Sequence, residues 1–311
     1  MIAFGPVNSR RLGMSLGINN IVSPKKCTYS CVYCQVGKTR QKTTHREVFF
    51  TPEKLVQDVR QHLLKLDPGH RPDYLTIVSN GEPTLDRNLG EEIMQLKQSG
   101  IRVAVISNGS LIDKKEVRED LMLADWVSLK IDSVDESVWK KINQPAEDLV
   151  LSRILEGIQQ FAEHYKGFLC TETMLVEGYN DQTLYLENTA SFISRLRPYT
   201  AYLSIPTRPP AEKKVRAVTE AKITEAWNIF QDKEIPAQLL TGFEGTDTGY
   251  TGNIYEDILN ITSVHPLRED TLQELLQKEN SNSQVLFTLI EQGLIKEISY
   301  NGKKYYLRHY H

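Results

Sequence analysis

Segments typical of strands alternate with segments typical of helices from Pro52 to about Gly252. We expect strands near residues 14–22 and over 73–78, 101–106, 126–132, 168–176 and 201–205. Helices are expected from Pro52, with Thr51 as N-cap, and over 88–99, 113–123, 135–142, 148–164, 181–196 and 217–230. Such alternation predicts an α/β fold of parallel strands with right-handed crossovers. Six repeats are fewer than the eight of a closed barrel, so we predict a partial, open (β/α)6 barrel with its site at the C-terminal ends of the strands.

Three cysteines lie close together in the loop after the first expected strand, in the segment Cys27-Thr28-Tyr29-Ser30-Cys31-Val32-Tyr33-Cys34. Their spacing is C-x3-C-x2-C, and the only other cysteine of the 311 residues is Cys170. Thiolates hold iron–sulfur clusters, and three thiolates on a four-iron cluster keep one iron open for a small chelating ligand. The alternatives are a zinc site with a fourth ligand such as His45, or incidental thiols.

The overall composition is that of an ordinary globular protein, with 40% hydrophobic and 25% charged residues. No apolar run approaches the length that crosses a bilayer, and the N-terminus lacks the features of a signal peptide. With few cysteines and no leader, we expect a reducing, cytoplasmic location and no membrane partner. Residues 1–60 carry ten Lys and Arg against three Asp and Glu. This excess of about +7 predicts an anionic substrate, or a solvated basic face that compensates for thiolate charge.

The combination of C-x3-C-x-Tyr-Cys with a strand followed by Gly81-Glu82-Pro83 resembles the radical S-adenosylmethionine (SAM) superfamily, over about residues 1–250. The resemblance implies that the three cysteines hold a [4Fe-4S] cluster, with Tyr33 beside it, and that SAM binds the open iron. Glu82 would accept the methionine ammonium in a charge-assisted bond. The resemblance also implies that Ser107, Asn108, Lys130 and Asp132 lie near the SAM carboxylate and ribose. The strand backbone from Met174 to Val176 would lie near adenine.

A narrower resemblance is carried by residues 5–13, 15–19, Asn80-Gly81-Glu82-Pro83-Thr84-Leu85 and Thr207-Arg208-Pro209-Pro210. These stretches are similar to a family of radical SAM Fe–S oxidoreductases distantly related to the tRNA wyosine-forming enzymes. The wyosine-forming enzymes use extra cysteines for a second cluster. Here Cys170 alone is left over, so no auxiliary cluster is expected, and Cys170 is predicted to be a small buried apolar residue.

The pattern changes at about residue 250, which predicts two domains, 1–250 and 251–311. Three short helices and a hairpin with Asn301-Gly302 at its turn read as a winged helix. Residues 252–311 carry six Lys and Arg against eight Asp and Glu, and only the wing, with Lys303, Lys304 and Arg308, is locally basic. This balance argues against an ordinary DNA reader. Recognition of RNA or protein, and structural packing or dimerisation, remain open.

The main hypothesis is a radical SAM oxidoreductase or transferase. Such an enzyme takes an electron from a donor such as flavodoxin or ferredoxin, cleaves SAM reductively, and abstracts hydrogen from an RNA base, a protein side chain or a small anionic metabolite. The alternative is a cluster-bearing redox sensor acting through the winged helix, which has no need for the Gly-Glu-Pro motif. Arg10, Arg11 and Arg208 flank the expected gap in the barrel. We expect them to converge on an anionic substrate group, or to bind the SAM carboxylate or a structural acid.

Overall fold

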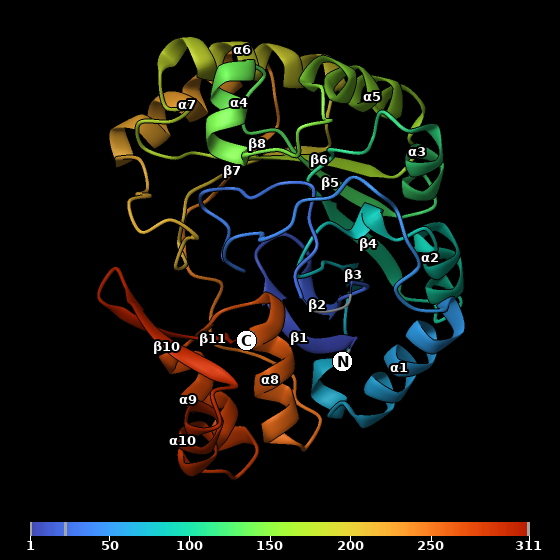
Figure 1. Ribbon diagram of the computed structural model, residues 1–311, viewed down its shortest axis with the longest axis vertical. Coiled ribbons are helices and arrows are strands. Elements are labelled where there is room, and N and C mark those ends of the chain that lie inside the picture. Colours follow the sequence, from blue (N-terminus) through green and yellow to red (C-terminus); the bar gives the residue numbers. More distant parts are fainter. Residues whose placement is uncertain (1, 22–23, 310–311) are drawn as a thin grey trace.

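The computed structural model describes residues 2–21 and 24–309, and its largest element is an eight-stranded sheet whose strands follow the order of the sequence. Strand β1 is antiparallel to β2, and β2 to β8 are parallel. The sheet is an open, curled half-barrel with β1 and β8 at its edges (Figure 1). Its strands are β1 (Ala3–Ser9), β2 (Gly13–Ile18), β3 (Tyr74–Ile77), β4 (Arg102–Ser107), β5 (Trp126–Lys130), β6 (Phe168–Met174), β7 (Thr200–Ser204) and β8 (Ala237–Leu240).

The α/β partial barrel is confirmed, but the sheet has two strands more than the six predicted. Residues 237–240, which the sequence shows only as a short apolar segment, form the seventh parallel strand. Strand β1 was missed because Gly5-Pro6 interrupts its pattern, and its ladder with β2 is itself irregular between Phe4 and Val7. Proline is tolerated there because β1 is an edge strand.

Helices α1 to α3 and α5 to α7 follow one another around the outside of the curled sheet (Figure 1). Helix α1 begins at Pro52, and the side chain of Thr51 accepts from the Lys54 N–H, which confirms the predicted N-cap. Both faces of the parallel strands contribute buried apolar residues: Leu75, Val103 and Val127 lie in one core cluster, and Ala104, Trp126 and Cys170 lie in another. The helices are α1 (Pro52–Lys65), α2 (Leu89–Lys97), α3 (Lys115–Leu121), α4 (Glu136–Asn143), α5 (Leu151–His164), α6 (Thr183–Leu196) and α7 (Glu220–Asp232), with short 3-10 turns at Pro68–His70 and Pro83–Leu85.

The C-terminal elements lie beside β1 at the open side of the sheet (Figure 1). Their bounds are α8 (Ile254–Val264), β9 (Leu267–Arg268), α9 (Glu269–Lys278), α10 (Gln284–Glu291), β10 (Ile295–Tyr300) and β11 (Lys303–Arg308). The three strands form a sheet in the order β10-β11-β9, and Asn301 and Gly302 both have positive φ in the predicted hairpin turn. The core of this module includes Ile258, Leu272 and Leu289, and Phe4 from β1 joins it.

Among the described residues, the helices are all too short or too polar to cross a membrane.

Candidate functional site

A cavity of about 320 Å³ lies at the C-terminal ends of the strands, under the loop that carries the three cysteines. It brings together thirteen of the sixteen site residues predicted from sequence. The predicted residues that line it are Arg10, Arg11, Cys27, Cys31, Tyr33, Cys34, Gly81, Glu82, Ser107, Asn108, Lys130, Met174 and Arg208. Pro83, Asp132 and Val176 do not line it. The open half-barrel therefore collects these residues at one place, as the ends of parallel strands do.

Each of the three thiols has one nitrogen donor beside it. Lys25 Nζ lies 3.2 Å from the sulfur of Cys34, Asn108 Nδ2 lies 3.6 Å from that of Cys27, and Asn143 Nδ2 lies 3.4 Å from that of Cys31. Burial raises the pKa of the Cys27 thiol to about 11 and that of Cys31 to about 12. Buried thiols of this kind become thiolates only with a metal or a cation nearby. The donors and the burial therefore fit sulfur ligands of a metal cluster.

Gly81 is the point where the end of β3 meets the cysteine loop. A Cβ atom at this position would lie 1.6 Å from the carbonyl oxygen of Lys26. The next backbone N–H, that of Glu82, donates to the same oxygen at 3.1 Å. Only glycine permits this approach, so Gly81 positions the cysteine loop over the strand ends.

The carboxylate of Glu82 joins the ends of β3 and β4. It is 1% exposed. Its Oε1 accepts from the hydroxyls of Thr84 and Ser107, both at 2.7 Å, and its Oε2 accepts from the Asn108 N–H at 2.8 Å. Burial raises the pKa of Glu82, and these hydrogen bonds oppose the rise.

Asp132 lies behind the cavity wall rather than on it. Its Oδ2 accepts from the Tyr33 hydroxyl and, at 2.7 Å, from Asn143 Nδ2, and its Oδ1 accepts from the Met174 N–H at 2.8 Å. The Val176 N–H is likewise already bonded, to Asn180 Oδ1 at 2.9 Å. Asp132 therefore holds Tyr33 and the end of β6 in place, and the backbone N–H groups expected near adenine both have protein partners.

A buried ion cluster occupies one wall of the cavity. Lys130 Nζ lies 3.1 Å from Glu172 Oε1, and Arg11 pairs with the same carboxylate. The Ser204 hydroxyl donates to Glu172 at 2.9 Å. Burial acts to raise the pKa of Glu172, but Arg11 and Lys130 hold it well below its usual range.

A second ion cluster joins the barrel to the C-terminal module, where His265 Nε2 lies 3.2 Å from Glu244 Oε1. Arg208 pairs with Glu244 and donates to Gln35 Oε1 at 2.6 Å. Arg10 Nε lies 3.8 Å from Glu244, and its Nη1 donates to the carbonyl of Leu240 at 2.8 Å. The three predicted arginines thus converge on one cavity, and each has a protein carboxylate as partner.

The sequence reasoning missed several residues of this site, namely Lys25, Gln35, Asn143, Glu172, Ser204 and Glu244. A signal existed for Glu172, because it is a charged residue inside an apolar strand pattern. No comparable signal marks Glu244, which lies in an irregular segment after β8.

The donor set fits an iron–sulfur cluster better than a single zinc ion. Within residues 2–21 and 24–309, no three His, Cys, Asp or Glu side chains are placed to hold one metal ion. His45, the suggested zinc ligand, lines a different cavity with Arg46, Arg87, Lys114 and Glu116. In a cubane cluster each thiolate binds a different iron, so the three sulfurs need not converge on one point.

Comparisons with known proteins agree with this geometry. Residues 21–190 match the family model described as Radical SAM superfamily. The UPF0026 protein MJ1312 of Methanocaldococcus jannaschii is 44% identical over 309 residues, 99% of this chain and 96% of that protein. The Brachyspira hyodysenteriae protein named GTPase Obg is 30% identical over 305 residues, which cover 96% of this chain but 44% of that protein.

Solved structures show the same fold at low identity. A structure of TYW1 with a lysine–pyruvate adduct bound has a TM-score of 0.50 and 17% identity, and the match covers 96% of this chain and 82% of that one. The resemblance to a wyosine enzyme, noted from the sequence, is therefore present in the fold. The family-model match extends over more than half of the chain and includes the cysteine loop and the Gly-Glu-Pro strand end. The chain therefore belongs to the radical SAM superfamily, whose members use SAM and an iron–sulfur cluster.

Proposed function

We propose that the protein is an enzyme that holds a [4Fe-4S] cluster on Cys27, Cys31 and Cys34, cleaves SAM reductively, and abstracts hydrogen from a substrate. The observation that carries the proposal is the single cavity lined by all three thiols and by Gly81 and Glu82. When bound, the cluster supplies the electron for cleavage of SAM. An acidic one-electron donor such as flavodoxin or ferredoxin would reduce it, and we place the protein in the cytoplasm.

The free acceptor capacity of Glu82 supports its role in binding the methionine ammonium. An ionised carboxylate has about four acceptor positions, two on each oxygen. Oε1 already accepts from Thr84 and Ser107, whereas Oε2 accepts only from the Asn108 N–H. Oε2 therefore retains one acceptor position for an ammonium group, and a charge-assisted bond there would be strong.

Positive charge on the opposite wall supports binding of carboxylate or other anionic groups. Lys130 Nζ lies 4.9 Å from the centre of the Tyr33 ring, within the buried cluster that includes Glu172. Arg10, Arg11 and Arg208 also line the cavity, and we assign them to an anionic part of the substrate.

We further propose that residues 251–311 form a winged-helix-like domain beside a radical SAM domain of residues 1–250. The three helices, the three-stranded sheet and the apolar core of this part, to which the barrel contributes Phe4, support the division. A redox sensor acting through this domain is the alternative function. A sensor has no use for a cavity with a SAM-binding edge, so we favour the enzyme.

The proposal is tested by anaerobic reconstitution with iron and sulfide. The wild-type protein should hold about four irons per chain, and the triple variant Cys27→Ala, Cys31→Ala, Cys34→Ala should hold none. Cys170→Ala is the matched control, because Cys170 is fully buried outside the cavity. Stoichiometric zinc without iron, or a second cluster, would overturn the assignment.

A further inference from the structure

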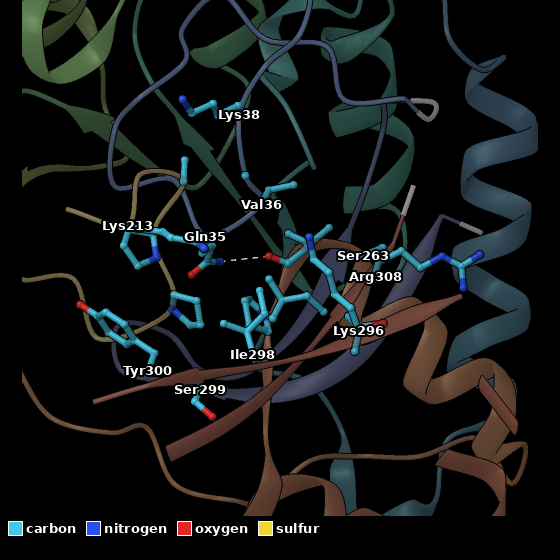
Figure 2. A pocket seen from close by; sticks show the side chains of 18 of the residues that line it. Gln35, Val36, Lys38, Lys213, Ser263, Lys296, Ile298, Ser299, Tyr300 and Arg308 are labelled. Carbon is cyan, nitrogen blue, oxygen red and sulfur yellow. Dashed lines mark hydrogen bonds between the residues drawn. The ribbon is translucent and has the colours of Figure 1, made fainter. Parts of the chain in front are cut away.

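A groove of about 760 Å³ lies next to the cavity, between the barrel and the C-terminal module (Figure 2). Its walls are residues 35–38 directly after Cys34, residues 209–211, 213 and 216 after β7, the end of α8, and the hairpin β10–β11. We infer that this basic groove binds a single-stranded polynucleotide along its phosphates and delivers one nucleotide to the cysteine cavity. The inference rests on the proposed function and names its substrate class.

Five cationic side chains line the basic groove: Lys38, Lys213, Arg216, Lys296 and Arg308. No Asp or Glu among the described residues lines it, and none of the five forms an ion pair with that part of the chain. Among the described residues, the positive charge of these side chains is therefore balanced by no acid that lines the groove.

The charges in the cysteine cavity differ from those in the basic groove. Each of its four Lys and Arg side chains already has a carboxylate partner, because Arg11 and Lys130 share Glu172 while Arg10 and Arg208 share Glu244. Unpaired positive charge is therefore concentrated in the basic groove rather than spread over the site. Several unpaired cations along a concave surface fit a polyanion such as a phosphodiester chain.

The floor of the groove favours a nucleic acid over an acidic peptide. Lys296, Ile298 and Tyr300 occupy alternate positions of β10 and all line the groove, so a face of the hairpin forms the floor. The Tyr300 hydroxyl donates to the carbonyl of Pro206 at 3.0 Å, which holds the ring in position. Single-stranded nucleic acids bind to such surfaces by stacking bases on aromatic rings beside basic residues. Addition of a peptide strand to β10, which is an edge strand, is the competing mode of binding that the test includes.

Gln35 connects the basic groove with the cavity. Its Nε2 donates to the carbonyl of Val264 at 3.0 Å (Figure 2), and its Oε1 accepts from Arg208 at 2.6 Å. Gln35, Val36 and Val264 line both spaces. Since Gln35 directly follows Cys34, a chain lying in the groove passes the cysteine cavity.

The negative net charge of the C-terminal module does not extend to the groove. Its acidic residues lie away from the groove, and Glu297 on β10 is 3.5 Å from Lys304 on the neighbouring strand. Lys303 and Lys304, expected from sequence to form a basic wing, do not line the groove. Arg308 does, together with Lys296.

The test is fluorescence anisotropy of a labelled oligouridine with the 311-residue chain, without reductant. For five phosphate contacts on a single strand, the logarithm of the association constant should fall with the logarithm of salt concentration with a slope of about −3.5. The double variant Lys213→Ala/Lys296→Ala should bind more weakly, and its slope should be smaller by about 1.4. The matched control is Lys166→Ala/Lys303→Ala, which removes two exposed lysines outside the groove and should bind as the wild type does.

Three results would overturn the inference. One is equal binding by the groove variant and the wild type, with both shown folded by thermal melting. Another is tighter binding of a polyglutamate peptide of matched charge, which would indicate an acidic protein partner. The third is equal affinity for a duplex of the same length. Binding of oligouridine needs no SAM cleavage, so the two claims can be refuted separately. If the protein cleaves SAM but does not bind oligouridine, only the inference about the groove is wrong. If it binds oligouridine but never cleaves SAM, only the proposed function is wrong.

Discussion

The backbone N–H of Asn108 donates a hydrogen bond of 2.8 Å to the carboxylate of Glu82, which joins the end of β4 to the end of β3 beside the cysteine loop. The side chain of Asn108 also reaches the sulfur of Cys27 at 3.6 Å. The proposed SAM-binding edge and a proposed cluster ligand are thus linked through one residue. A change at Glu82 should therefore affect both.

Replacing Glu82 should weaken SAM binding. Loss of a hydrogen bond to a charged group costs about 1.5–3 kcal/mol, so Glu82→Ala should lower SAM affinity roughly tenfold to a hundredfold, measured by calorimetry on the oxidised, reconstituted protein. Thr84→Val is the matched control, because it removes one donor to Glu82 at a residue that does not line the cavity. Unchanged affinity in Glu82→Ala at normal iron content would refute the role of Glu82.

A methyl group at position 81 should displace the cysteine loop. The Cβ of Gly81→Ala would lie 1.6 Å from the Lys26 carbonyl oxygen, and overpacking of this kind costs about 1–3 kcal/mol. We expect a lower melting temperature and poor iron incorporation. Gly242→Ala is the control, since a Cβ there meets no atom within 4 Å. Full iron incorporation in Gly81→Ala would contradict the proposed positioning of the loop.

A buried acid pair behind the Gly-Glu-Pro turn should make stability depend on pH. Asp86 and Glu92 are fully buried, and their carboxyl groups affect each other's protonation. Burial, then the neighbouring Asp86, raises the pKa of Glu92 to about 9, and burial raises that of Asp86 to about 6 although Arg46 opposes it. A raised pKa means that the folded state prefers the protonated acid, so stability is full below the unfolded pKa and is lost as pH rises toward 9.

Glu92→Gln should remove most of this dependence, because an amide keeps a donor toward Asp86 at every pH. Each unit of pKa shift corresponds to about 1.4 kcal/mol, so the melting temperature of the variant should exceed that of the wild type at pH 9 and approach it at pH 5. The control is Glu91→Gln, an exposed neighbour on α2. A wild-type melting temperature that rises from pH 5 to pH 9 would show that the pair is ionised at no cost.

Much of the site could be predicted because motif and topology agree. The loop with Cys27 follows β2, Glu82 follows β3 and Asn108 follows β4, and parallel strands bring these ends together whatever the details of twist. Spacing along the sequence was therefore enough to place them at one cavity.

The remaining features depend on side-chain direction, which spacing does not determine. Asp132 follows β5 as predicted but turns behind the wall to bind Tyr33 and the Met174 N–H. Glu244 meets Arg208 only because an irregular segment returns past β1. Strand β1 carries a glycine and a proline, which hide its strand pattern, and it is recognised only from its pairing with β2.

The most direct test of the central claim is the release of 5′-deoxyadenosine. Anaerobically reconstituted protein is reduced with dithionite and mixed with SAM, and the products are separated by liquid chromatography. The account predicts 5′-deoxyadenosine and methionine in equal amounts, formed slowly without substrate, and none from the triple cysteine variant. Absence of 5′-deoxyadenosine from wild-type protein that carries a full cluster and binds SAM would contradict it.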